Sequence, residues 1–140
     1  AYQDFHGAHG YAIDETLIVS APYTLEGGRL ATRQFLDLAQ PPTAIFAAND
    51  VLALATIQVA LARGVRVPEA LSVVGMDDIE SASMSTPLLT TVAKDKYEIG
   101  RRAAEMLLNR LDNEAPAEPQ RGVVPCTLVE RQSAAPLQQV

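Results

Sequence analysis

The sequence lacks tryptophan and has a single cysteine, Cys126, among its 140 residues. One cysteine forms neither an internal disulfide nor a cysteine-based metal cluster. No apolar run approaches the roughly 20 residues that a membrane-spanning helix needs, and no signal peptide opens the chain. Basic residues are also scarce: the chain has 11 Lys and Arg and 17 Asp and Glu, which gives a net charge of −6. This charge argues against binding to a nucleic-acid phosphate backbone. These absences predict a cytoplasmic protein without a membrane partner.

What is present fits one globular domain. The mass is 15.0 kDa, with 48% hydrophobic and 20% charged residues, and a chain of this size buries enough surface to fold without covalent staples. The first residues have a helical pattern and no initiator Met. We therefore expect the sequence to be a fragment or a processed product.

Apolar, β-branched runs alternate with helical patterns along the chain. Thr24 is expected to cap one helix, and Gly64 to end another. Buried strands that alternate with helices predict an α/β fold with a parallel sheet and helices on both faces. The expected strands are Thr16–Ser20, Thr43–Ala48, Leu71–Met76, Leu89–Val92 and Cys126–Glu130; the expected helices are Ala1–Gly10, Leu25–Ala39, Val51–Arg63 and Tyr97–Asp112; Glu114–Gln120 is expected to be a connector and Ser133–Val140 a loose tail.

Polar side chains follow three successive predicted strands. Tyr23 comes shortly after the first, Asn49-Asp50 after the second and Asp77-Asp78 after the third. Ligands of parallel α/β sheets bind beyond the carboxyl ends of the strands, so an aromatic ring, an amide and a carboxylate there suit a small hydroxylated ligand. The alternative is structural, because Asn and Asp after a strand often cap the next helix. For Asp50, which directly precedes a helix, capping is the favoured interpretation.

The sequence offers two alternatives in which a metal ion would be bound. Asp50, Asp77 and Asp78, with Lys94 or Lys96, could form a Mg²⁺ pocket for phosphoryl transfer, as in response-regulator receivers, but the paired acids come too late in the order of strands. His6 and His9 have helical spacing without further ligands nearby, which favours solvent-facing histidines. No metal and no cofactor are expected.

Several segments in order resemble one family. They are PTAIFAAND (42–50), RGVRVPEALSVVGMDD (63–78), TPLLTTV (86–92), YEIGRRAAEMLLNRL (97–111) and LVERQS (128–133). Together they resemble the effector-binding domain of LacI/GalR (lactose-repressor/galactose-repressor) transcription regulators, over residues 1–133. The resemblance implies a two-lobed, type I periplasmic-binding-protein-like fold with an effector between the lobes.

The resemblance also implies a division of the chain. Residues 10–90 and 126–133 correspond to the C-terminal lobe, and helix 97–112 corresponds to part of the N-terminal lobe. Residues 134–140 are a tail. The DNA-binding headpiece is expected to be absent, so operator DNA would be bound only through that missing segment.

The resemblance implies effector-binding residues at individual positions of this sequence. Asn49 and Asp77 match the amide and carboxylate that bond effector hydroxyls, and Tyr23 matches an aromatic position against the effector. Lys96 stands where the family often has an apolar or aromatic contact, which suggests an acidic or phosphorylated ligand as a hypothesis. The expected ligand is a sugar or sugar-like metabolite.

The family further implies a homodimer through the helix after Asn49 and the segment 79–86. The alternative is that these apolar residues pack inside the domain. The expected interface residues are Leu54, Ile57, Leu61, Ser81 and Met84. The resulting prediction is a non-enzymatic sensing and dimerisation portion of a repressor, with a periplasmic solute-binding protein of a sugar transporter as the closest alternative and the Mg²⁺-dependent receiver as a more distant one.

Overall fold

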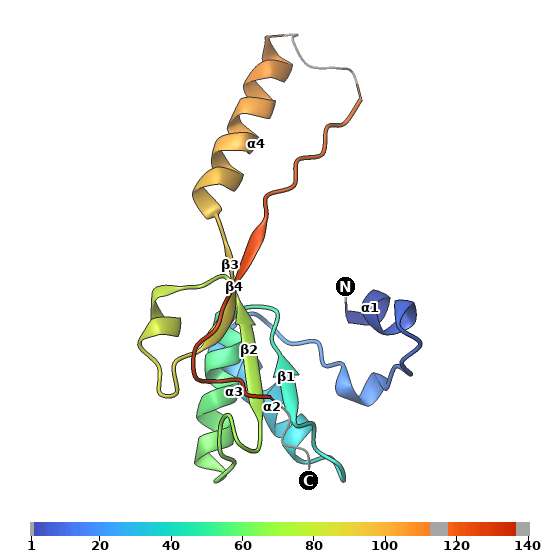
Figure 1. Ribbon diagram of the computed structural model, residues 1–140, viewed down its shortest axis with the longest axis vertical. Coiled ribbons are helices and arrows are strands. Elements are labelled where there is room, and N and C mark those ends of the chain that lie inside the picture. Colours follow the sequence, from blue (N-terminus) through green and yellow to red (C-terminus); the bar gives the residue numbers. More distant parts are fainter. Residues whose placement is uncertain (1, 113–117, 137–140) are drawn as a thin grey trace.

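The computed structural model describes residues 2–112 and 118–136, and its centre is one four-stranded sheet (Figure 1). Strands β1 (Ala44–Phe46), β2 (Ser72–Met76) and β3 (Thr90–Lys94) are parallel neighbours in that order. Strand β4 (Cys126–Val129) is antiparallel to β3, with Thr91 opposite Val129. The chain leaves β3 at its carboxyl end and returns from that same end, so β4 has to run the other way. The parallel arrangement predicted from the sequence is confirmed for β1–β3.

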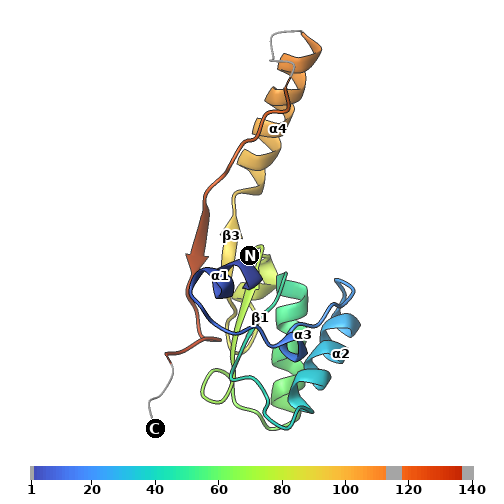
Figure 2. The ribbon, with the colours of Figure 1, turned by 90° about the vertical axis from the view of Figure 1, so that its right-hand side faces the viewer.

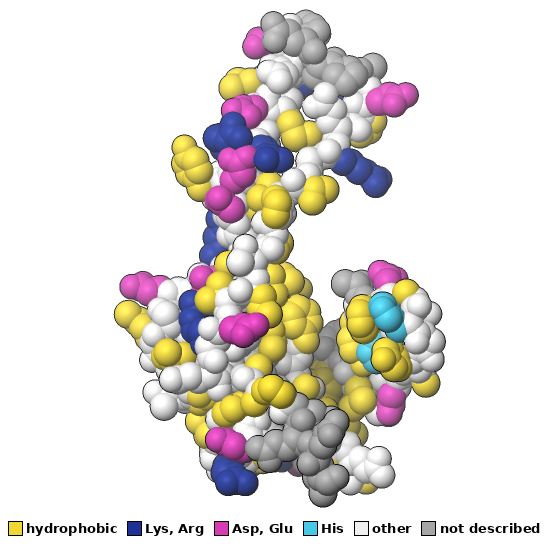
Figure 3. All heavy atoms as spheres, in the orientation of Figure 1, with side chains coloured by type: hydrophobic (Ala, Val, Ile, Leu, Met, Phe, Trp, Pro, Cys, Tyr) yellow, Lys and Arg dark blue, Asp and Glu magenta, His cyan; other side chains and the backbone are white. Residues whose placement is uncertain are grey.

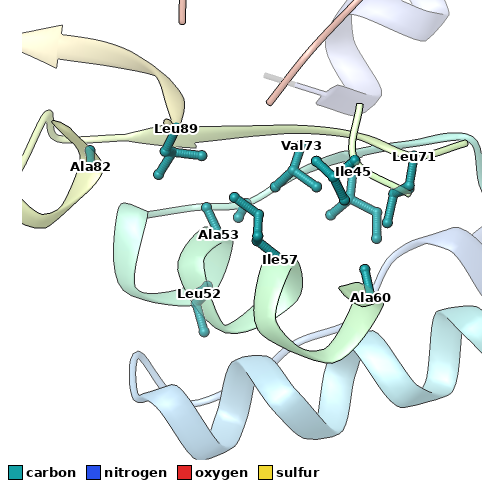
Figure 4. Packing of buried hydrophobic residues seen from close by; sticks show 11 residues of the cluster. Ile45, Leu52, Ala53, Ile57, Ala60, Leu71, Val73, Ala82 and Leu89 are labelled. Carbon is teal, nitrogen blue, oxygen red and sulfur yellow. The ribbon is translucent and has the colours of Figure 1, made fainter. Parts of the chain in front are cut away.

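Helix α3 (Asp50–Ala62) packs on one face of the sheet, and α2 (Leu25–Leu36) packs against α3 (Figure 2). Thr24 caps α2 and Gly64, at φ +74°, follows the end of α3, both as predicted. The apolar core lies between α3 and the strands (Figure 4). Its fully buried members include Ala53, Leu71, Val73 and Leu89.

The opposite face of the sheet differs from the expectation of helices on both faces. The strands alternate between buried and more exposed residues, and Phe46 of β1 is 57% exposed. Figure 3 shows apolar side chains gathered on the body of the molecule in this view. Among the described residues, the helices that pack on the sheet therefore form a layer on one face.

Helix α4 (Lys96–Leu111) stands away from the body of the molecule (Figures 1 and 2). It has no buried residue, and Leu107, Leu108 and Leu111 are all more than half exposed. Of the helices in residues 2–112 and 118–136, none has the length and apolar content of a membrane span. This helix thus carries apolar surface that the described part of the chain leaves uncovered.

The expected first strand, Thr16–Ser20, is wrong. Helix α1 (Tyr2–Ala8) and Gly10, at φ +70°, agree with the predicted start, but a 3₁₀ helix, η1 (Glu15–Leu17), follows. The carboxylate of Asp14 accepts hydrogen bonds from the backbone N–H and hydroxyl of Thr16, at 2.9 and 2.6 Å. This local turn competes with an extended conformation, and β1 remains the edge strand.

The end of the chain holds another correction. Ser133, expected in a loose tail, is fully buried. Its hydroxyl donates to the carbonyl of Val73 at 2.6 Å and accepts from the N–H of Thr90 at 2.8 Å, so it joins β2 to β3. Residues 137–140 of the expected tail and 113–117 around the expected connector lie outside the described residues.

Candidate functional site

Asn49 lies at the turn from β1 into α3. Its side-chain oxygen accepts a hydrogen bond from the N–H of Leu52 at 2.9 Å, so Asn49 is the N-cap of α3. Capping uses the amide oxygen, and the amide nitrogen has no hydrogen-bond partner within the described part of the chain. The residue is half-buried. It can therefore cap the helix and still donate to a ligand.

Asp50 does not cap α3, which corrects the favoured interpretation of this residue. It is fully buried as the first residue of the helix. Its carboxylate accepts from the Thr91 hydroxyl at 2.5 Å and from the Ile79 N–H at 2.9 Å. A Cβ at Gly75 would come within 2.2 Å of the same carboxylate, so only glycine fits beside it. Asp50 thus joins α3 to β3 and to the segment after β2, and it is shielded from any ligand.

Asp77 and Asp78 form the turn that follows β2, as expected. Both have positive φ, at 115° and 48°. One oxygen of Asp77 lies 2.5 Å from the Lys94 ammonium, and one oxygen of Asp78 lies 2.7 Å from the Arg131 guanidinium. The hydrogen bond from Lys94 to Asp77 raises the pKa of the Lys94 ammonium. Each acid is therefore held by a cation from a later segment of the sheet.

Among the described residues, no hydrogen bond or ion pair joins Tyr23 or Lys96 to Asn49, Asp77 or Asp78. Tyr23 is 69% exposed and lines a cavity of about 450 Å³ between residues 17–21, α2 and β1; Ala48, the neighbour of Asn49, lines the same cavity. Lys96 is an exposed residue at the start of α4, two positions beyond Lys94. Asp95 between them caps α4 by accepting from the N–H of Glu98 at 2.9 Å.

The structure adds residues that the motifs did not single out as ligand-site residues. From the sequence, Lys94 was a candidate only for the Mg²⁺ alternative, and Arg131 was only a member of the LVERQS segment. Their charge and their place in or next to strands were visible, but their partners lie in other segments, so pairing could not be read from local spacing. Thr91 likewise gave no sign that it bonds Asp50.

The Mg²⁺ alternative finds no support in this geometry. Asp50 is buried against Thr91 and Ile79, whereas Asp77 and Asp78 are each paired with a cation. Within the described ranges, no three His, Cys, Asp or Glu side chains gather as metal ligands. His9 donates from Nδ1 to the Phe5 carbonyl at 2.9 Å and stacks on the Phe5 ring, so it has a local role.

The expected dimer residues divide into two groups. Ile57 is 3% exposed and packs in the core, which corrects its placement on the interface. Leu54 is partly buried against the same core. In contrast, Leu61 is 45% exposed and Met84 71% exposed, and Ser81 is exposed as well. The last three are available to a partner.

Comparison with known proteins gives a consistent assignment. Residues 1–134 match the family model of the periplasmic binding protein-like domain. The chain is 39% identical over 128 residues to the HTH-type transcriptional repressor CytR of Escherichia coli strain K12, and 44% identical over 130 residues to the HTH-type transcriptional regulator DegA of Bacillus subtilis. Each alignment covers 91% of this chain and 37% of the relative. The chain therefore spans little more than a third of these relatives.

Solved structures agree with the sequence matches. A complex of the transcriptional regulator CelR with cellobiose superimposes with a TM-score of 0.87 at 38% identity, over 95% of this chain and 40% of that one. A LacI-type transcription regulator from Bifidobacterium animalis gives a TM-score of 0.85 at 31% identity, over 96% of this chain and 48% of that one. These similarities extend over nearly all of the present sequence.

Proposed function

Because the chain belongs to the periplasmic binding protein-like domain family and matches part of the effector-binding domain of LacI/GalR-type regulators, we propose that it is the effector-sensing and dimerisation portion of a transcriptional repressor. The complete protein would then be longer than this sequence, as its relatives are. Its ligand would be a sugar or a sugar-like metabolite, and its role would be binding rather than catalysis.

The observation that carries this proposal is the polar cluster at the carboxyl ends of β1 and β2. Asn49 offers a free amide nitrogen, and Asp77 offers one carboxylate oxygen that the ion pair with Lys94 leaves unused. A hydroxyl group both donates and accepts, so one donor and one acceptor on neighbouring strands suit a polyhydroxylated ligand. Tyr23 and Lys96 would contact the ligand from the sides of this cluster.

The proposal divides this chain between two lobes. Residues 10–90 and 126–133 form the C-terminal lobe, and α4 belongs to the N-terminal lobe. The separation of α4 from the body and its uncovered leucines support this division. The effector would sit between the lobes and favour one arrangement of them, and that difference in affinity would alter operator binding by a headpiece outside this sequence.

A homodimer in the cytoplasm completes the proposal. Leu61 and Met84 are exposed apolar side chains on α3 and just after η2 (Glu80–Ser83), and Ser81 lies between them in the chain. Exposed apolar residues on neighbouring elements are suited to a subunit contact. The regulators among the relatives favour this role over that of a transporter subunit.

A thermal-shift screen of the complete regulator tests the proposed function. The panel contains cellobiose, sucrose, a hexose 6-phosphate, nucleobases, and Mg²⁺ with acetyl phosphate. A ligand that binds the native state alone raises the melting temperature, and a concentration 100-fold above Kd adds about 2.7 kcal/mol. Stabilisation by a sugar-like compound is expected. Stabilisation by Mg²⁺ with acetyl phosphate alone would contradict the sensor assignment and restore the receiver alternative.

A further inference from the structure

The turn after β2 has an unusual backbone. Asp77 and Asp78 are consecutive non-glycine residues at positive φ. Residues other than glycine rarely adopt a positive φ, and those that do are usually fixed by their surroundings. Asp77, whose carboxylate would bind the effector in the proposed function, therefore needs contacts that stabilise its backbone conformation.

The support comes from β3 and from Arg131, which follows β4. The Asp77 N–H donates to the Val92 carbonyl at 2.9 Å, which fixes the start of the turn against β3. The Lys94 ammonium lies 2.5 Å from Oδ1 of Asp77, and the Arg131 guanidinium donates to Oδ1 of Asp78 at 2.7 Å. Arg131 also donates to the Leu89 carbonyl at 2.8 Å, so it is fixed to the sheet.

The Lys94–Asp77 ion pair leaves part of both side chains accessible. The Lys94 and Asp77 side chains are 33% and 27% exposed, so a ligand can reach both. Oδ1 of Asp77 is committed to Lys94, and Oδ2 has no hydrogen-bond partner among the described residues. Lys94 is also the last residue of β3, directly before the Asp95 cap of α4. The hydrogen bond to Asp77 raises the pKa of the Lys94 ammonium, which is charged at neutral pH already at its ordinary value of 10.5.

We propose that Lys94 is a positioning residue of the effector site: by binding one oxygen of Asp77, it fixes the carboxylate on its strained turn and presents the other oxygen to a ligand hydroxyl. This inference rests on the proposed function, because it takes Asp77 as the ligand carboxylate. Lys94 acts through Asp77, so its effect on binding requires that carboxylate. Lys94 increases the affinity for the ligand by preorganisation, since the acceptor oxygen is already oriented before the ligand arrives.

A double-mutant cycle tests the inference in the complete regulator. Binding of cellobiose, sucrose and a hexose 6-phosphate is titrated for wild type, Lys94→Met, Asp77→Asn, the double variant and Lys94→Arg. The Lys94→Met change is expected to weaken binding about tenfold, within the range of coupling between groups in contact. In the Asp77→Asn background the same change is expected to have no effect, and Lys94→Arg is expected to restore most of the affinity.

Matched controls separate the possible outcomes. Arg33→Met removes one positive charge from the exposed surface of α2 and should leave binding unchanged. Melting temperatures without compound show whether any variant has lost its fold. If a compound binds wild type and Lys94→Met binds it equally well, or loses affinity equally with and without Asp77, the positioning role is wrong while the sensor function stands. If no compound of the panel binds wild type, the proposed function fails and this inference fails with it.

Discussion

At the scale of single residues, Asp50 has a structural role beside the proposed effector site. Its buried carboxylate satisfies the Thr91 hydroxyl and the Ile79 N–H, and it lies beside Asn49 in the chain. Removal of the carboxylate leaves two buried donors without an acceptor, and each such group is costly. The sequence placed this residue in the correct region and assigned it the wrong role.

Asp50→Ala is expected to lower the free energy of unfolding by about 2–4 kcal/mol, because it opens space and leaves donors unsatisfied. Urea denaturation measures this change. The control is Asp37→Ala, which removes an exposed carboxylate that accepts from Arg63 and should cost under about 1 kcal/mol. Equal losses in the two variants would contradict the structural role of Asp50.

The Lys94–Asp77 ion pair predicts a specific pH dependence. The partner carboxylate raises the folded-state pKa of Lys94 above its ordinary value of 10.5. The pair therefore stabilises the fold fully below pH 10.5, and this contribution is lost as pH rises through the folded pKa. An NMR titration of the Lys94 side chain, assigned with Lys94→Gln, should show a lower pKa in Asp77→Asn. An unchanged pKa would mean that the pair does not form in solution.

The positions of Asn49 and Asp77 at the ends of strands could be predicted from the sequence. Both follow strands, and the rule that ligands gather at strand carboxyl ends places them from local sequence alone. The pairing of Lys94 with Asp77 and of Arg131 with Asp78 was not predictable, since these ion pairs depend on the register of β3 and on the path after β4. Ser133 was missed for the same reason.

At the scale of elements, α4 depends on a network of charges along its exposed surface. Glu98 accepts from Arg101 and Arg102, and Arg101 also pairs with Glu105. Hydrogen bonds from the two arginines lower the pKa of Glu98 to about 2. The network therefore supports the helix without any buried residue.

Acid should weaken α4 in a defined window. Because the pKa of Glu98 falls from 4.5 to about 2 on folding, its stabilising contribution is present above pH 4.5 and is lost as pH falls toward 2. Backbone amide chemical shifts of residues 96–111, followed from pH 6 to pH 2, measure the loss of helix. Glu98→Gln should remove the part of the transition that belongs to this residue. An identical transition in the variant would show that Glu98 does not stabilise the helix.

Most helices and strands followed from the hydrophobic pattern and the caps, but the expected strand Thr16–Ser20 and the placement of Ile57 failed for nonlocal or competing reasons. Thr16–Ser20 has the composition of a strand, yet the Asp14 side chain bends its start, and strand structure needs a paired neighbour. The family resemblance placed Ile57 on a dimer surface, and the apolar residues of α3 beyond one stripe were compatible with that placement. That same pattern is expected of a helix buried between a sheet and α2, where the structure places most of it.

At the scale of the whole molecule, uncovered apolar surface predicts association of this chain. Leu107, Leu108 and Leu111 are exposed on a helix that extends from the body. Exposed apolar groups of this kind drive contact between copies. The isolated 140-residue chain is therefore expected to form oligomers through α4, as seen by light scattering.

The matched variant for this prediction is Leu107→Glu with Leu111→Glu, which should shift the chain toward monomer. Leu61→Glu on α3 serves as the comparison, because it tests the proposed dimer surface instead. A monomeric wild-type chain whose α4 is well protected from hydrogen exchange would contradict association through this helix.

The proposed effector site lies at the carboxyl ends of β1 and β2, with Lys94 at the end of β3 as its positioning residue. Hydrogen exchange of the complete regulator, with and without the compound that stabilises it most in the screen, tests this directly. Protection on binding is expected to concentrate in segments 47–52, 76–80 and 93–97. Protection confined to the cavity wall at 17–23 and 42–46, with no change in those three segments, would contradict the account.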